Sequence, residues 1–220
     1  MMLSPRLSAD ACLSLLDNVG CDRILHGPMA SLRTMVDDIS QRKMIRCRPV
    51  PDLSYGRTCE TSVLIGVPQD CDLETRRNRV ALILHSSGST GTPKPLFLTH
   101  RSLVRQSLHG SGLTTFNPLP WYHLHGLTSA LQAISAQKTA FMWNAALPLT
   151  AQSVVRALNA ARPQSIAAVP YLLQLLVDDP RGIDALRACE LVTYGGAPCP
   201  DELGERLVKE GVHFGGFFGL

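Results

Sequence analysis

One short stretch of the sequence gathers hydroxyl groups, glycines and a positive charge, which makes it a candidate for binding chemistry. Its residues are Ser86, Ser87, Gly88, Ser89, Thr90, Gly91 and Lys94. Glycines allow backbone N–H groups to turn toward an anion, hydroxyls donate further hydrogen bonds, and lysine adds a full positive charge. This combination predicts a loop that holds the phosphates of a nucleotide. The alternative is a surface turn that binds nothing.

Two predicted strands hold this loop. The apolar run 80–84 has the length and β-branched character of a buried strand, and 96–98 predicts a short return strand. Thr99 can then cap a helix over 100–109. A Walker P-loop places its lysine at the start of a helix, whereas Lys94 lies between two prolines. A conventional P-loop NTPase is therefore the weaker alternative.

A second candidate segment, residues 120–127, sets His123 and His125 beside aromatic residues and a glycine at a predicted helix start. An imidazole in this place can donate a hydrogen bond to an anion or line an apolar pocket. Taken alone, the pattern also fits a packed histidine with a local hydrogen bond. The segment therefore indicates a binding site only when its position relative to the other candidate segments is considered.

A third candidate segment, residues 194–198, follows a predicted strand and contains Gly195, Gly196 and Ala197. Two glycines at the carboxyl end of a strand allow a flat ligand to approach the backbone closely. In open α/β sheets, ligands bind at that edge. We therefore expect this segment to border a ligand.

The three segments, in this order, resemble those of the adenylate-forming superfamily, which includes acyl-CoA synthetases, luciferases and the adenylation domains of nonribosomal peptide synthetases and carboxylate reductases. The Pro-aromatic-His-x-x-Gly pattern of that family falls on Pro120, Tyr122, His123 and Gly126. The resemblance implies that His123 is catalytic and lies near the carboxylate and the phosphates. Trp121 and His125 fall on positions that the family leaves variable, so we assign them packing or lining roles.

The resemblance also implies which residues contact the nucleotide. The β- and γ-phosphates would be contacted by Ser86, Ser87, Gly88, Ser89, Thr90, Gly91 and Lys94, and the adenine by Gly195, Gly196, Ala197 and Phe218. No residue of the chain is assigned to a metal, because the magnesium-coordinating glutamate of the family motif would follow Leu220. The implied cofactors are ATP and Mg²⁺.

By the same resemblance, residues 1–220 form a partial AMP-binding domain that lacks the opening region and the C-terminal part of the family. The implied reaction joins a small carboxylic acid to ATP as an acyl-adenylate. Transfer to a thiol of CoA, or of phosphopantetheine on a carrier protein, would follow in a larger synthetase. A truncated, non-catalytic remnant with weak or no nucleotide binding is the alternative.

The fold class is predicted as α/β, with mostly parallel sheets flanked by helices, because strand and helix patterns alternate. The expected helices are 9–19, 29–39, 126–136, 150–161, 171–177 and 200–210. The expected strands are 21–25, 139–143, 165–169 and 191–194, and 46–79 is expected to be connecting structure with one strand at 63–65. The resemblance identifies this arrangement as an incomplete large N-terminal domain of the adenylate-forming fold.

The composition argues against several other classes of protein. The hydrophobic share of 45% and the charged share of 18% fit a folded chain, and no apolar stretch reaches the length of a membrane span. With a net charge of +3 and one tight basic cluster, at 76–79, we expect a solvated turn and no nucleic-acid surface. The seven cysteines form no C-x-x-C pair, which favours reduced thiols in a cytoplasmic protein over zinc or disulfides.

Overall fold

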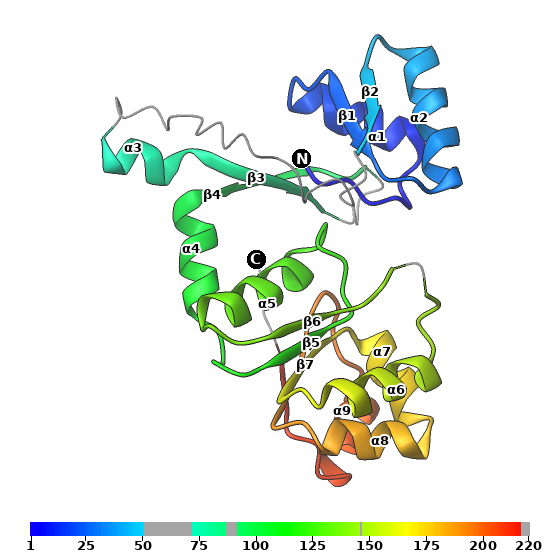
Figure 1. Ribbon diagram of the computed structural model, residues 1–220, viewed down its shortest axis with the longest axis vertical. Helices are drawn as coiled ribbons and strands as arrows, with labels where there is room; N and C mark the ends of the chain where they lie inside the picture. Colours follow the sequence, from blue (N-terminus) through cyan, green and yellow to red (C-terminus); the bar gives the residue numbers. More distant parts are fainter. Residues whose placement is uncertain (51–71, 87–91, 146, 217–220) are drawn as a thin grey trace, which may run out of the picture. The chain divides into compact units, whose positions relative to one another are not determined.

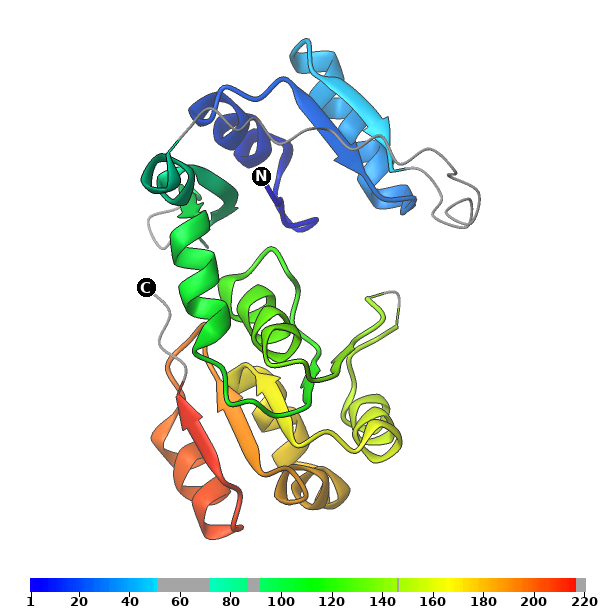
Figure 2. The same cartoon turned by 60° about the vertical axis from the view of Figure 1, so that its left-hand side comes forward.

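The computed structural model describes residues 1–50, 72–86, 92–145 and 147–216 of the chain (Figures 1 and 2). It divides into two compact units, Met1–His100 and Arg101–Leu220. Helices and strands alternate in both units, which confirms the α/β prediction.

The first unit begins with a small α/β layer. Its elements are α1 (Ala9–Asn18), β1 (Arg23–His26), α2 (Ala30–Arg42) and β2 (Arg46–Pro49). Ser8 caps α1, as its side chain accepts a hydrogen bond from the Ala11 N–H. Strands β1 and β2 pair in parallel, and buried Cys12, Leu16 and Ile39 pack between the helices. The predicted helices are confirmed, whereas β2 lies where only connecting structure was expected.

A β-hairpin completes the first unit, in the order α3 (Leu73–Asn78), β3 (Val80–His85) and β4 (Pro95–Thr99). The antiparallel pairing of β3 with β4 confirms the predicted return strand. The expectation of a buried β3 was wrong for its first half: Val80 is 49% exposed, and only Leu84 and His85 are buried. The residues of β3 are apolar on both faces of the strand, yet within this unit only its carboxyl end is buried.

The predicted solvated turn at the basic cluster is instead part of a helix. Asp72 caps α3 by accepting hydrogen bonds from the Glu74 and Thr75 N–H groups, Arg76 and Arg77 occupy the last turn, and Arg79 is the C-cap. Positive charge there suits the helix dipole. The strand predicted at 63–65 lies outside the described residues.

A parallel sheet forms the centre of the second unit. After α4 (His100–Leu108), its elements are β5 (Thr115–Asn117), α5 (Leu124–Ser135), β6 (Ala140–Met142), α6 (Ala151–Ala161), β7 (Ser165–Ala168), α7 (Pro170–Val177), α8 (Pro180–Arg187), β8 (Leu191–Tyr194), α9 (Asp201–Lys209) and β9 (Phe214–Gly216). The strands lie in the order β6-β5-β7-β8-β9, and all neighbours are parallel.

The two faces of this sheet differ in polarity because side chains alternate along each strand. Phe116, Ile166 and Val192 point into the main core, which α6, α7, α8 and α9 cover. The alternating residues Thr115 and Ser165 belong to the other face, on which α5 lies (Figure 1). Helices thus flank the sheet on both sides.

Three elements of the second unit were not predicted: β5, α8 and β9. The Pro and Gly near the start of α8 resemble a helix break, but Pro180 occupies the first turn, where a missing N–H does no harm. Gly182 lets α8 approach α7 closely, since an added Cβ would lie 2.1 Å from the Leu176 carbonyl oxygen. The strand β9 is only Phe-Gly-Gly, and glycine disfavours strands.

Adjacent residues of α7 offer a test of this core. Leu172 is fully buried, whereas Tyr171 is 69% exposed. We expect Leu172→Ala to lower the free energy of unfolding by about 2–5 kcal/mol, because it leaves a cavity between α7 and the sheet. Tyr171→Ala should change it by less than about 0.5 kcal/mol. Urea unfolding followed by circular dichroism measures both, and equal effects would contradict the assigned faces.

Candidate active site

The ends of the predicted phosphate loop are pinned together in the first unit. The Ser86 N–H donates to the Lys94 carbonyl oxygen at 2.9 Å, and the Lys94 N–H donates to Ser86 Oγ at 3.0 Å. Lys94 is exposed, and among the described residues no carboxylate pairs with its ammonium group. The residues between these ends that were assigned to phosphate lie outside the described ranges: Ser87, Gly88, Ser89, Thr90 and Gly91.

A buried histidine supports the start of this loop. His85 Nε2 accepts a hydrogen bond from the Ser4 N–H at 3.0 Å, so its ring proton is on Nδ1, which lies 3.1 Å from the Ser86 carbonyl oxygen. The Met2 N–H also donates to the Ile83 carbonyl oxygen, at 2.9 Å. The first residues of the chain therefore brace the strand that leads into the loop. No local sequence signal could have revealed these bonds, since the partners are far apart in sequence.

The predicted catalytic histidine lies in the second unit, on the connection from β5 to α5. His123 is the exposed N-cap residue of α5, and its ring contacts that of Tyr122, with centroids 4.7 Å apart. Its N–H donates to the Pro120 carbonyl oxygen at 3.2 Å. Gly126, in the first turn of α5, packs against the backbone of Pro120. A glycine is required there, since an added Cβ would lie 2.3 Å from the Pro120 carbonyl oxygen.

His125 faces the interior. Its side chain is buried, and desolvation lowers its pKa from 6.5 to about 4. The imidazole is therefore neutral at pH 7. This supports the expected packing role and distinguishes His125 from exposed His123, two residues earlier.

The predicted adenine segment lies after β8, also in the second unit. The Gly195 N–H donates to the Ala168 carbonyl oxygen at 3.2 Å, continuing the pairing of β8 with β7. Gly196 has a φ of +82°, which favours glycine, and both Gly196 and Ala197 are exposed. Phe218, the remaining residue assigned to adenine, lies outside the described residues.

The fold brings the His123 and Gly195–Ala197 segments to the same edge of the sheet. Both follow the carboxyl ends of parallel strands, β5 and β8, with β7 between them. The chain order also reverses between β5 and β7, because β6 lies on one side of β5 and the later strands on the other. Ligands in open α/β sheets bind beside such a switch point. Ser86 and Lys94 belong to the first unit.

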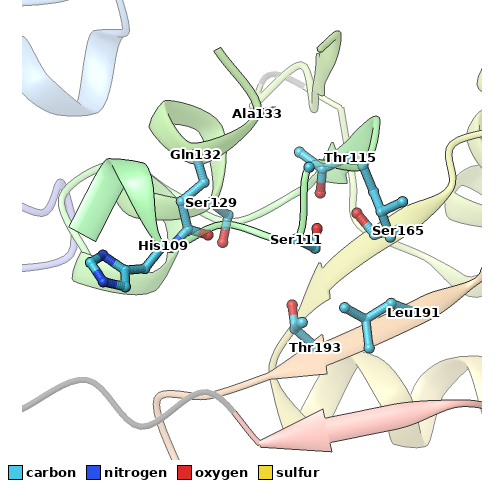
Figure 3. Close-up of a pocket in the computed structure, with 11 residues that line it drawn as sticks. His109, Ser111, Thr115, Ser129, Gln132, Ala133, Ser165, Leu191 and Thr193 are labelled. Atoms are coloured by element: carbon cyan, nitrogen blue, oxygen red, sulfur yellow. The ribbon is translucent and has the colours of Figure 1, made fainter. Parts of the chain in front are cut away.

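A separate cavity of about 190 Å³ opens on the α5 side of the sheet (Figure 3). Thr115, Ser165 and Leu191, which line it, are the first residues of β5, β7 and β8. The cavity therefore lies toward the amino ends of the strands, away from the His123 edge. Sequence reasoning did not indicate it.

Comparison with known proteins decides the family. The model of the AMP-binding enzyme family matches residues 1–220. The chain belongs to this family. A non-canonical non-ribosomal peptide synthetase of Acremonium egyptiacum, ascB, is 31% identical over 100% of the chain and 21% of its own length. An adenylate-forming reductase of Aspergillus terreus is 26% identical over 99% of the chain and 22% of its own length.

Solved structures show the same fold. ATP-bound MatB from Rhodopseudomonas palustris matches with a TM-score of 0.72 and 18% identity, over 94% of this chain and 41% of that one. This AMP-binding chain therefore has the architecture of the N-terminal domain of adenylate-forming enzymes. It spans about a fifth of the length of the two curated relatives named above.

The described residues include no helix long and apolar enough to cross a membrane, and no group of three or more potential metal-binding side chains. Their free thiols are Cys12, Cys21, Cys47, Cys189 and Cys199.

Gly126→Ala should disturb the turn that carries His123. Because the new Cβ would overlap the Pro120 carbonyl oxygen, we expect a loss of about 1–3 kcal/mol in unfolding free energy. Gly215→Ala is the matched control, since an added Cβ there meets no atom within 4 Å. Urea unfolding compares the two variants. A Gly126→Ala variant as stable as the control would refute the close approach.

The buried His125 should make stability depend on pH. Its unfolded form binds a proton near pH 6.5 and its folded form only near pH 4, so stability is fully present above 6.5 and falls as the pH drops toward 4. At about 1.4 kcal/mol per pKa unit, the total loss is about 3 kcal/mol. A His125→Leu variant should show a weaker decline in unfolding free energy over that pH range. Parallel declines for the two proteins would contradict this assignment.

Proposed function

We propose that this chain contributes the ATP-binding part of an enzyme that activates a small carboxylic acid as its acyl-adenylate. In that reaction a carboxylate oxygen attacks the α-phosphorus of ATP, and the bond to the bridging oxygen breaks, releasing pyrophosphate. The observation that carries the proposal is the placement of the His123 and Gly195–Ala197 segments at one switch-point edge of an AMP-binding fold. That edge is where nucleotides bind in related sheets.

The proposed nucleotide contacts divide according to chemistry. The exposed Lys94 ammonium and the hydroxyl and backbone N–H groups of Ser86, Ser87, Gly88, Ser89, Thr90 and Gly91 would bind the β- and γ-phosphates. Gly195, Gly196 and Ala197, with Phe218, would border the adenine. The absence of a Cβ at exposed Gly196 suits close approach of a flat ring. These residues fit ATP.

His123 is proposed to act on the carboxylate side. As an exposed N-cap residue it can donate from its ring to a developing negative charge, beside the N-terminus of α5. Mg²⁺ would accompany ATP, bound to phosphate oxygens and water, and it neutralises phosphate charge. We assign no side chain of this chain as its ligand.

The chain would work as a partial AMP-binding domain of a larger cytoplasmic synthetase. Support comes from the relatives described above, of which it spans about a fifth, and from its free thiols, which fit a reducing compartment. The adenylate would then pass to a thiol of CoA, or of phosphopantetheine on a carrier protein, as a thioester. The names of the two relatives, a synthetase and a reductase, fit such a second step.

Nucleotide binding is tested first by thermal unfolding of the 220-residue chain with and without MgATP. We expect Tm to rise with nucleotide, since a ligand at 100 times its Kd stabilises by about 2.7 kcal/mol. The rise should be lost in Lys94→Ala and kept in Lys138→Ala, which removes another exposed lysine. If MgATP left the Tm of the wild-type chain unchanged, the proposal that this chain binds nucleotide would be overturned.

Catalysis is tested in the larger synthetase that includes this chain, by acid-dependent exchange of labelled pyrophosphate into ATP with a panel of small aliphatic and aromatic carboxylic acids. Exchange reports the reversal of adenylate formation and needs no thiol acceptor. We expect His123→Ala to lower the exchange rate by about 10²–10³, the effect of removing one transition-state donor. ATP binding without exchange for any acid would leave a nucleotide-binding, non-catalytic chain and overturn the proposed reaction.

A further inference from the structure

One buried polar side chain lies directly beneath the His123 segment. Asn117 ends β5 with no exposed surface. Its Nδ2 donates to the Gly126 carbonyl oxygen at 2.5 Å, and its Oδ1 accepts from the Leu119 N–H at 3.0 Å. A buried amide is tolerated when both its donor and its acceptor sides are bonded. Here both sides are bonded to the backbone.

These two backbone partners stand at opposite ends of the segment that carries His123. Leu119 begins the turn after β5, and Gly126 belongs to the first turn of α5. A single side chain therefore closes the loop onto the end of its strand. Contacts within the segment also keep it compact. The backbone N–H of His123 donates to the Pro120 carbonyl oxygen, and Gly126, which has no Cβ, leaves room for that oxygen.

We propose that Asn117 is a positioning residue, which fixes His123 at the carboxyl edge of the sheet by clamping residues 119–126 to the end of β5. Its catalytic consequence rests on the proposed function. Among side chains of this size, only an amide supplies a donor to Gly126 and an acceptor to Leu119 without charge. Displacing a reacting group by about 1 Å can reduce the rate about 100-fold, so a clamp of this kind matters for catalysis.

The segment contains its own reporter. Trp121 lies within it and is 38% exposed, and the chain has 2 tryptophans. The other, Trp143, packs edge-on against Phe116. In a Trp143→Phe background, Trp121 is therefore the one tryptophan whose fluorescence follows the segment, with or without enzyme activity.

The first experiment measures acrylamide quenching and anisotropy of Trp121 in that background. Asn117→Leu, which is similar in size but cannot form the two hydrogen bonds, should raise the quenching constant about twofold and lower the anisotropy. Thr115→Val is the matched control, since it removes a buried hydroxyl from the same strand and face but leaves the clamp intact. Fluorescence unchanged by Asn117→Leu would overturn the clamp.

Asn117→Asp provides a second variant if Asn117→Leu does not fold. It retains the acceptor for the Leu119 N–H and loses the donor to the Gly126 carbonyl oxygen. Release of Trp121 in this variant supports the clamp as well. A Trp121 signal like that of wild type would count against it.

The second experiment is a double-mutant cycle on acid-dependent pyrophosphate exchange. If Asn117 acts through His123, Asn117→Leu should lower exchange about 10- to 100-fold, and adding it to His123→Ala should lower exchange little further. If the two substitutions together lowered the exchange rate by the product of their separate effects, the positioning role would be overturned. If wild-type protein shows no exchange, the proposed function fails, whereas the Trp121 measurement still decides whether Asn117 holds the segment.

Discussion

Parallel pairing of strands is the constraint on which the second unit depends. Parallel strands must return through crossovers, so every carboxyl end meets the same edge of the sheet, and the loops that follow them become neighbours. The crossover helices α6, α7, α8 and α9 supply the apolar layer that keeps the sheet in place. Because α5 occupies the other face, the strand order can reverse between β5 and β7. The candidate site is a consequence of this reversal.

The two candidate loops are held by different means. The His123 segment is fastened by a buried amide and by the close approach at Gly126, both within a well-packed layer. The loop between Ser86 and Lys94 is closed by hydrogen bonds between its own ends, at the tip of a two-stranded hairpin. Buried hydrogen bonds and close packing thus hold the segment of the proposed catalytic histidine, whereas hydrogen bonds between the loop's own ends hold the proposed phosphate loop.

Local signals in the sequence were sufficient for much of the fold. The predicted starts at 150 and 171 lie within one residue of those of α6 and α7, where Thr150 is the N-cap and Pro170 is in the first turn, because caps and first-turn prolines act within a few residues. The order of the candidate motifs sufficed for the family. Exposed β2, with the sequence Arg-Cys-Arg-Pro, carries no apolar alternation and could not be recognised.

What sequence reasoning missed are contacts between residues whose proximity only the fold creates. The bond from the Ser4 N–H to His85 joins residues 81 positions apart. The role of Asn117 depends on two backbone groups that its residue type does not reveal. Strand order is likewise invisible in periodicity, so the switch point between β5 and β7 could not be placed. These features govern geometry more than they govern the choice of helix or strand.

The bracing of the hairpin by the first residues has a practical side. Met2 and Ser4 each give a backbone hydrogen bond to β3, one of them to a buried imidazole that also holds the carbonyl group of Ser86. A purification tag fused ahead of Met1, or an amino-terminal protease, would therefore act close to the root of the Ser86–Lys94 loop.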